Sequence, residues 1–270
     1  MKLVLCSVPA ILLISTAIAT ADNTTAGSAR PLMLGEVERT SFSDAPLTTE
    51  RWYLVPLVAE RSYAVYAWTP GVDPAVQDPD IAAIEFFGDA LGTPATGVID
   101  TADKEVRVEL PGQKQSQASI IPDTGGVHWI RVSTSSTPTA AFDVDIVIVE
   151  TTLFTPFWVV DTSANSSSYI EYRNTTDSAI TVVLRAYDGT GLEVGVQPPL
   201  TLVTPANGSS YIDMEATMGA PAGFGSAQIA HTGPPGGVVA NLTSLSAQSG
   251  LSFDTPFVPR MLWTPLGQYP

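Results

Sequence analysis

Residues 124–150 read TGGVHWIRVSTSSTPTAAFDVDIVIVE, and this stretch decides the fold class. Residues 128–132 place apolar and polar side chains alternately on two faces, and residues 142–148 repeat the alternation. A period of two is typical of half-buried antiparallel strands. The linking residues 133–140 are rich in Ser, Thr and Pro, which predicts that the two strands form a hairpin.

The rest of the chain repeats this pattern. Runs of β-branched and aromatic residues alternate with turns marked by Gly, Pro and Asn. The runs span residues 51–58, 62–69, 81–87, 106–110 and 118–121, and then 168–173, 180–187, 200–203, 211–214, 226–231 and 237–242. The three residues 59–61 are short enough for a hairpin between the first two runs. Such spacing is typical of a β-sandwich.

The sequence therefore predicts an all-β protein with two consecutive antiparallel β-sandwich domains of the jelly-roll or immunoglobulin-like type. We expect the first sandwich over residues 37–150 and the second over residues 151–260, with a C-terminal tail at 261–270. Thr- and Pro-containing residues directly after the strand that ends at Glu150 mark the boundary between them.

The N-terminus has a different composition. Lys2 precedes an apolar run, and small residues at 17–21 offer cleavage sites, a pattern typical of a secretory signal peptide over residues 1–21. The run is short for a membrane anchor and contains Pro9. Cys6, the single cysteine of the chain, lies within it, so the mature protein is expected to lack disulfides. Residues 22–36 are small and polar, which predicts a flexible leader.

The charge is strongly acidic. The sequence has 12 Lys and Arg against 27 Asp and Glu, a net charge of −15. Such a field repels phosphate backbones and anionic lipid, which argues against nucleic acid as a partner and against membrane insertion after signal cleavage. Solubility, or adaptation to a salty medium, is the favoured explanation of the acidity, ahead of an acidic binding face.

Several motifs of the first half follow a recognisable order. The aromatic pair Trp52-Tyr53 opens a strand, and a short turn at 59–61 leads to the next. An Asp-flanked strand over residues 80–88 ends in Gly, and the segment 126–132 precedes the final alternating strand at 142–149.

In this order the motifs resemble the bacterial pre-peptidase C-terminal (PPC) domain, a small β-sandwich found in secreted peptidases and other extracellular proteins. The resemblance covers residues 37–150. The sequence departs from the family at Glu60, where the family usually has Gly, at Val127-His128, where it usually has Gly-x-Tyr, and at Phe142, where it usually has Tyr. The second half resembles no family that its motifs identify.

The sequence contains few residues or motifs that are typical of a catalytic site. Its two histidines, His128 and His231, fall in different predicted sandwiches, and neither a Gly-x-Ser-x-Gly elbow nor a His-Glu-x-x-His motif occurs. Asp143 and Asp145 share one face of a strand opposite an apolar row, and are interpreted as solvated surface rather than as catalytic carboxylates. Three tryptophans, at 52, 68 and 129, lie in alternating strands and are expected in the core.

The loop at residues 69–80 contains Asp73, Asp78 and Asp80, with Asp89 beyond the next strand. Carboxylates that converge on a loop can bind calcium, which makes Asp73, Asp78 and Asp80 weak calcium candidates. A set of Asp-Pro turns is the favoured alternative. No other metal or cofactor site is indicated.

Together these observations predict a non-enzymatic secreted bacterial protein, extracellular or periplasmic, that acts as a binding or structural module. The PPC resemblance implies a role in secretion, localisation or substrate attachment. The partner stays open, with an extracellular protein and a polysaccharide as the candidates. The alternatives are a carbohydrate-binding module, which requires at least two exposed coplanar aromatic rings, a carboxylate-dependent hydrolase, and an accessory part of a secreted peptidase.

The calcium hypothesis has a direct test. If residues 73–80 hold an ion, millimolar calcium should raise the melting temperature of the mature protein, because a ligand that binds the folded state stabilises it. Differential scanning calorimetry with and without chelator measures the shift. An unchanged melting temperature identifies the cluster as a turn.

Overall fold

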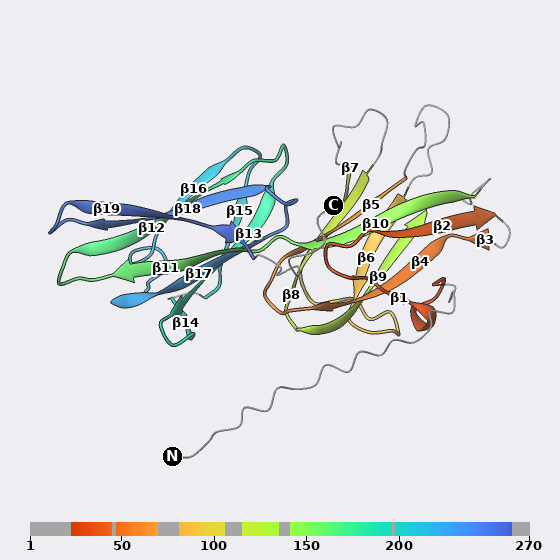
Figure 1. Cartoon of the computed structure of the whole chain (residues 1–270), viewed down its shortest axis with the longest axis horizontal. Coiled ribbons are helices and arrows are strands. Elements are labelled where there is room, and N and C mark those ends of the chain that lie inside the picture. Colours follow the sequence, from red (N-terminus) through yellow and green to blue (C-terminus); the bar gives the residue numbers. More distant parts are fainter. Residues whose placement is uncertain are drawn as a thin grey trace, which may run out of the picture.

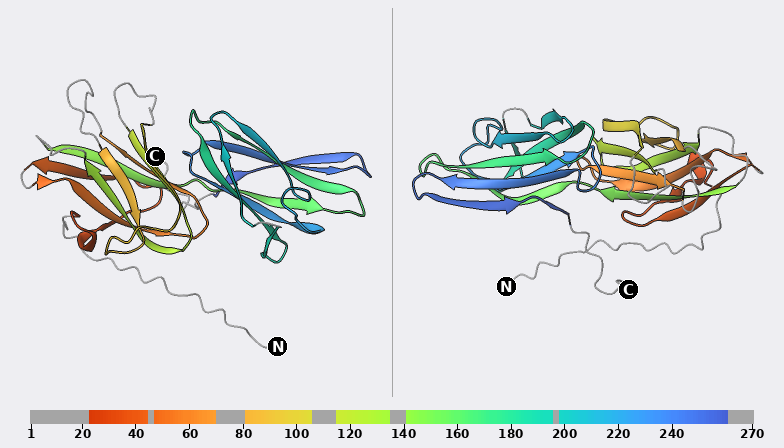
Figure 2. Two further views of the ribbon diagram at one scale, coloured as in Figure 1. Left: turned by 180° about the vertical axis from the view of Figure 1, so that it is seen from behind. Right: turned by 90° about the horizontal axis from the view of Figure 1, so that it is seen from above.

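The computed structural model describes residues 23–44, 47–69, 81–105, 115–134, 141–195 and 198–260. Within these ranges the regular structure is almost entirely β, with the 3-10 turn η1 (Ala26–Ser28) as the helical element. The strands form four sheets that pair into two sandwiches lying end to end (Figure 1). The expected all-β fold is confirmed. Two further views show the same elongated arrangement (Figure 2).

Two sheets build the first sandwich. Sheet I has the order β1 (Arg30–Pro31), β4 (Glu50–Leu57), β9 (Gly126–Thr134), β6 (Ile81–Phe87). Sheet II has the order β3 (Leu47–Thr48), β2 (Glu38–Asp44), β10 (Phe142–Glu150), β5 (Tyr63–Trp68), β8 (Gln115–Pro122), β7 (Gly97–Glu105). The pairing is antiparallel except between β1 and β4, which run parallel.

The second sandwich is built in the same way. Sheet III has the order β14 (Glu193–Val194), β13 (Ile180–Asp188), β17 (Gly223–His231), β11 (Leu153–Val160), β20 (Val258–Pro259), and β15 (Leu200–Thr204) also pairs with β13. Sheet IV has the order β16 (Ser209–Asp213), β12 (Ser166–Asn174), β18 (Val238–Ser246), β19 (Leu251–Pro256).

Each sandwich has its own apolar core, made by the inward residues of facing strands. In the first core Ile130 from sheet I and Ile146 from sheet II are fully buried. In the second core Ile229 from sheet III and Ile170 from sheet IV are fully buried. Burial of one such side chain stabilises the fold by about 1.5–3 kcal/mol. The alternation seen in the sequence therefore has its cause in these two separate cores.

The predicted flexible leader is wrong from Asn23 onward. Asn23 is buried, and its amide donates a hydrogen bond to Trp52 O over 3.2 Å. Leu32 is 1% exposed and belongs to the first core, while β1 pairs with β4. The small polar composition concealed these anchors because one buried leucine and one amide suffice to fix the segment on the sandwich.

The two predicted hairpins of the first sandwich are also wrong. β9 pairs with β4 and β6 in sheet I, whereas β10 pairs with β2 and β5 in sheet II. Likewise β4 and β5 lie in different sheets, so residues 59–61 cross between sheets. Strands that face one core from opposite sheets have the same alternation as strands that pair with each other.

Some sequence-based expectations fall outside the described residues. These are the signal peptide at 1–21, the calcium candidates Asp73, Asp78 and Asp80, the run at 106–110 and the tail at 261–270.

Trp158 is the largest fully buried side chain of the second core. It lies beside an irregularity between β11 and β17, and its indole Nε1 donates to Ser226 O over 3.0 Å and to Tyr187 O over 3.1 Å. Gly225 is its partner on β17, and an added Cβ there would overlap the carbonyl oxygen of Tyr187. The indole therefore links three strands of sheet III at one point.

Replacement of this indole should be costly. We expect Trp158→Phe to lower the free energy of unfolding by about 2–4 kcal/mol, because it opens a cavity and leaves buried carbonyl groups without their donor. Urea denaturation measures the loss. Phe224→Leu is the matched control, since Phe224 is 62% exposed on the same sheet. A loss no larger than that of the control contradicts this role of Trp158.

Candidate functional site

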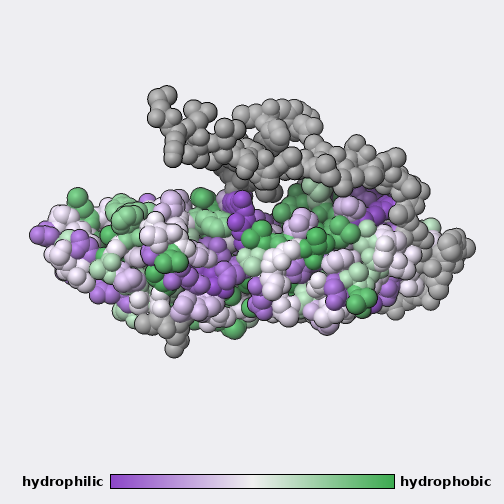
Figure 3. Space-filling model, turned by 90° about the horizontal axis from the view of Figure 1, so that it is seen from below, coloured by the Kyte–Doolittle hydropathy of each residue, from purple (hydrophilic) through white to green (hydrophobic). Residues whose placement is uncertain are grey.

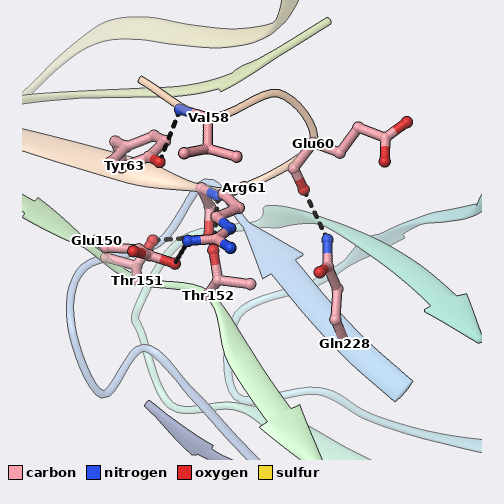
Figure 4. Close-up of polar contacts among 9 residues, drawn as sticks. Val58, Glu60, Arg61, Tyr63, Glu150, Thr151, Thr152 and Gln228 are labelled. Atoms are coloured by element: carbon pink, nitrogen blue, oxygen red, sulfur yellow. Dashed lines mark hydrogen bonds and ion pairs between the residues drawn. The ribbon is translucent and has the colours of Figure 1, made fainter. Parts of the chain in front are cut away.

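The junction between the two sandwiches is a dense set of polar contacts (Figure 4). The chain passes from β10 to β11 through Thr151 and Thr152, both of which are buried. Thr151 N donates to Ser62 O over 2.8 Å, and Ser62 N donates to Thr152 Oγ1 over 2.8 Å. Thr151 Oγ1 also donates to Ser62 Oγ over 2.9 Å. The connection is therefore bonded to the start of β5 rather than extended in solvent.

Glu60 is the central residue of the junction. Its φ of 66° lies in the left-handed region, which glycine favours. Its backbone N donates to Pro122 O over 2.8 Å, and its carbonyl oxygen accepts from Gln228 Nε2 of β17 over 2.8 Å. The turn thus presents its carbonyl to the second sandwich (Figure 4).

Charged groups surround this turn. Arg185 Nη1 of β13 lies 3.3 Å from Glu60 Oε1 and 2.9 Å from Glu193 Oε1. Arg61 Nη1 lies 3.6 Å from Glu150 Oε1. Burial raises the pKa of Glu150, and the positive charge of Arg61 opposes this effect. Hydrophilic residues are seen near the middle of the face shown in Figure 3, interspersed with apolar ones.

The apolar part of the junction is small. Ile121 of β8 packs with Val183 and Ala230 from the outer face of sheet III, and Val98 packs against them. Besides this small apolar contact, the polar contacts of Glu60 and of Thr151 join the two sandwiches at the junction. Sequence reasoning placed the domain boundary directly after Glu150, but it did not find the contacts of Glu60 across the junction. The one available signal for them was Glu60 at a position where the PPC family has Gly.

The left-handed turn provides a test of the junction. We expect Glu60→Gly to be more stable than Glu60→Ala by about 1 kcal/mol, because both lose the carboxylate but only alanine keeps the strained backbone. Urea denaturation measures the difference, and hydrogen exchange of the Thr151 amide reports on the junction itself. Equal stability of the two variants contradicts the strain.

The two histidines do not form a site together. His128 lies on the core side of β9, with Nδ1 3.2 Å from Gly126 O, whereas His231 ends β17 in the other sandwich. His231 is 1% exposed, and neither ring nitrogen has a hydrogen-bond partner of normal geometry among the described residues. Burial lowers the pKa of His231 to about 4, and backbone groups of Thr151 and Gly233 oppose this only in part.

This burial predicts acid sensitivity. The unfolded chain binds the proton of His231 near pH 6.5 and the folded chain near pH 4. The neutral ring therefore makes its full contribution to the free energy of unfolding above pH 6.5. This contribution, on the order of 3 kcal/mol, is lost as the pH falls toward 4.

The measurement compares the wild type with His231→Leu by urea denaturation between pH 7.5 and pH 4.5. The stability difference between the two proteins should shrink or change sign in favour of His231→Leu as pH falls. The carboxylates titrate equally in both proteins and cancel in the comparison. Identical pH dependences of the two stabilities therefore contradict the lowered pKa of His231.

The acidic pair of β10 takes a structural role. Asp143 is exposed as expected, but the interpretation of Asp145 as solvated surface is wrong, because that residue is 5% exposed. Asp145 accepts two hydrogen bonds from Arg39 of β2, over 2.6 and 2.8 Å. Arg39 stands directly opposite it in the register and covers the carboxylate.

The three tryptophans lie outside the first core cluster, although Trp52 is buried at 8% exposed, and Trp68 and Trp129 are half-buried. On β4 and β9 the core residues are Tyr53 and Ile130, so Trp52 and Trp129 project from the outer face of sheet I. The Trp52 ring centroid lies 5.1 Å from that of Phe87. The guanidinium of Arg131 covers both rings, at 5.5 Å from Trp52 and 5.4 Å from Phe87, which closes this aromatic group to ligands.

A second feature is a hollow of about 580 Å³ at the far end of the second sandwich. β11 starts at the junction and runs away from it, so the turn after Val160 lies at the distal tip (Figure 1). The hollow is bounded by this turn, by the turn after β16 and by the β18–β19 hairpin. Its lining includes Tyr169, Asp161, Asp213, Glu215 and several serines.

The aromatic ring in the hollow is paired. Tyr169 of β12 and Tyr211 of β16 have centroids 5.3 Å apart and planes 20° apart. Tyr211 is 62% exposed, so the pair belongs to the surface and not to the core. Among the described residues no three acidic, histidine or cysteine side chains converge closely enough to hold a metal ion. The geometry suits hydrogen bonding and ring stacking.

No family model matches the chain, and no curated sequence is significantly similar to it. Among solved structures the chain is similar to the adhesin domain of Epf from Streptococcus pyogenes, at 8% sequence identity and a TM-score of 0.28. That similarity covers 82% of this chain and 76% of that chain. A similarity of this degree establishes neither a shared function nor a shared ligand.

Within the described ranges no helix has the length and apolarity needed to cross a bilayer.

Proposed function

We propose that the chain is a non-enzymatic, secreted module of the bacterial extracellular space or cell envelope, and that it binds a partner through the far end of its second sandwich. The observation that carries the proposal is the open hollow at that end, which combines a surface ring pair with carboxylates and hydroxyl groups. Concave sites with a few placed polar groups are the usual binding sites of proteins.

The junction supports the same proposal. Glu60 and Thr151 tie the two sandwiches together over many bonds, so the hollow is held at a set distance from the first sandwich. A module that presents a ligand site benefits from such a fixed arrangement, because less conformational freedom is lost on binding.

The polar residues considered for catalysis also favour a non-enzymatic role. His128 and His231 are buried in separate sandwiches, and Asp145 is neutralised by Arg39. A general base must reach its substrate within hydrogen-bond distance, and these groups point into the protein or at each other.

We further propose that the first sandwich is a PPC-type domain that serves localisation or attachment. The support is the order of its sequence motifs, together with Glu60. That residue stands where the family has Gly, and it adopts the backbone conformation that glycine favours. The signal-peptide pattern at residues 1–21 supports secretion.

The test uses the mature chain, residues 22–270, immobilised and incubated with bacterial cell envelopes and with the secreted fraction. We expect retention of a component from one fraction, competed by soluble mature chain and absent with heat-denatured chain. A broad hydrolase screen runs beside it. Turnover that disappears when a single carboxylate is replaced overturns the non-enzymatic assignment.

A further inference from the structure

The charges of the residues that line the hollow at the distal tip limit the class of ligand that it can bind. Among the described residues that line it, none is basic, and three are acidic: Asp161, Asp213 and Glu215. On a chain with a net charge of −15, this lining repels phosphates, sulfates and uronic acids. A ligand must therefore be neutral or cationic and must supply hydrogen-bond donors.

The two aspartates are held in place as acceptors. Asp161 Oδ1 accepts from Ser163 N over 2.9 Å and from Ala164 N over 3.1 Å. Asp213 Oδ1 accepts from Glu215 N over 2.8 Å and from Ala216 N over 2.9 Å. The hydrogen bonds from Ser163 and Ala164 lower the pKa of Asp161, which keeps this carboxylate ionised. Each turn fixes the direction in which the second carboxylate oxygen points.

The hollow is also lined by the ring of Tyr169 and by Ser167. Tyr169 is supported by Tyr211 from the neighbouring strand, and among the described residues no cation covers this pair as Arg131 covers Trp52. Ser167 Oγ is buried and has no hydrogen-bond partner in the described structure. Buried hydroxyl groups are normally paired, so Ser167 Oγ is an unpaired polar atom beside the hollow.

A saccharide presents the complementary chemistry. Its C–H face packs on an aromatic ring, and its hydroxyl groups donate to carboxylates and exchange hydrogen bonds with serines. We propose that this hollow binds a neutral saccharide, with Tyr169 stacking on one sugar ring and with Asp161 and Asp213 accepting hydrogen bonds from its hydroxyl groups. The inference rests on the proposed binding function and names its ligand class.

The experiment measures binding of the mature chain to neutral and charged probes by isothermal titration calorimetry. The neutral probes are cellohexaose, chitohexaose and mannohexaose; the charged probes are hexagalacturonate and a lysine hexamer. We expect millimolar to micromolar binding of at least one neutral probe, with an affinity that is unchanged between 50 and 500 mM NaCl, because no ion pair forms.

Two variants connect binding to the hollow. Tyr169→Ala should weaken binding at least tenfold, and Asp161→Asn should weaken it while retaining an oxygen for the Ser163 and Ala164 bonds. Phe224→Ala, on the opposite sheet, should bind like the wild type. Circular dichroism and melting temperature check that each variant is folded, and Asp161→Asn serves as the decisive variant if Tyr169→Ala does not fold.

The outcomes separate the two proposals. Binding of the lysine hexamer alone, with an affinity that falls steeply with salt, overturns the saccharide assignment in favour of a cationic ligand. Neutral-probe binding that survives both hollow variants overturns it as well. Failure of all neutral probes while the envelope pull-down still succeeds overturns the saccharide assignment and leaves the binding function standing. Failure of the pull-down together with all probes overturns the binding function as well.

Discussion

The left-handed turn at Glu60 is the constraint on which the arrangement of the two sandwiches depends. At φ = 66° its carbonyl faces Gln228 and its carboxylate faces Arg185, both from sheet III. The next residues bring Ser62 against Thr151, which starts the second sandwich. A residue in a strained conformation persists only where its surroundings hold it, and here the bonds on both sides of the turn do so.

This junction determines which surfaces of the second sandwich stay open. Val183 and Ala230 lie on the outer face of sheet III and are covered by Ile121 of the first sandwich. Sheet IV lies on the opposite side, and its outer face carries Tyr169 and Tyr211 toward solvent. The first sandwich therefore covers sheet III only at the junction, whereas the hollow lies at the far end of the second sandwich and stays open.

Three arginines form ion pairs that hold strands together in this acidic protein. Arg39 neutralises Asp145, Arg131 lies between Glu50, Glu85 and two aromatic rings, and Arg185 links Glu60 to Glu193. With 12 basic and 27 acidic residues in the chain, basic side chains cannot match the carboxylates one to one. The excess negative charge makes the surface selective against anions, and this selectivity extends to the hollow.

The sequence by itself determined the fold class and most strand positions, because alternation at residues such as 128–132 and 142–148 reports that one face of each strand is buried. It even contained a signal for Tyr169, which shares the polar face of its strand with Glu171. Only the tertiary structure decided the partners: that β9 and β10 lie in opposite sheets, that Leu32 anchors the leader, and that the tryptophans at 52 and 129 face outward. A period of two shows which face of a strand is buried. Pairing, register and junction contacts arise between segments far apart in the chain, and the local pattern carries no record of them.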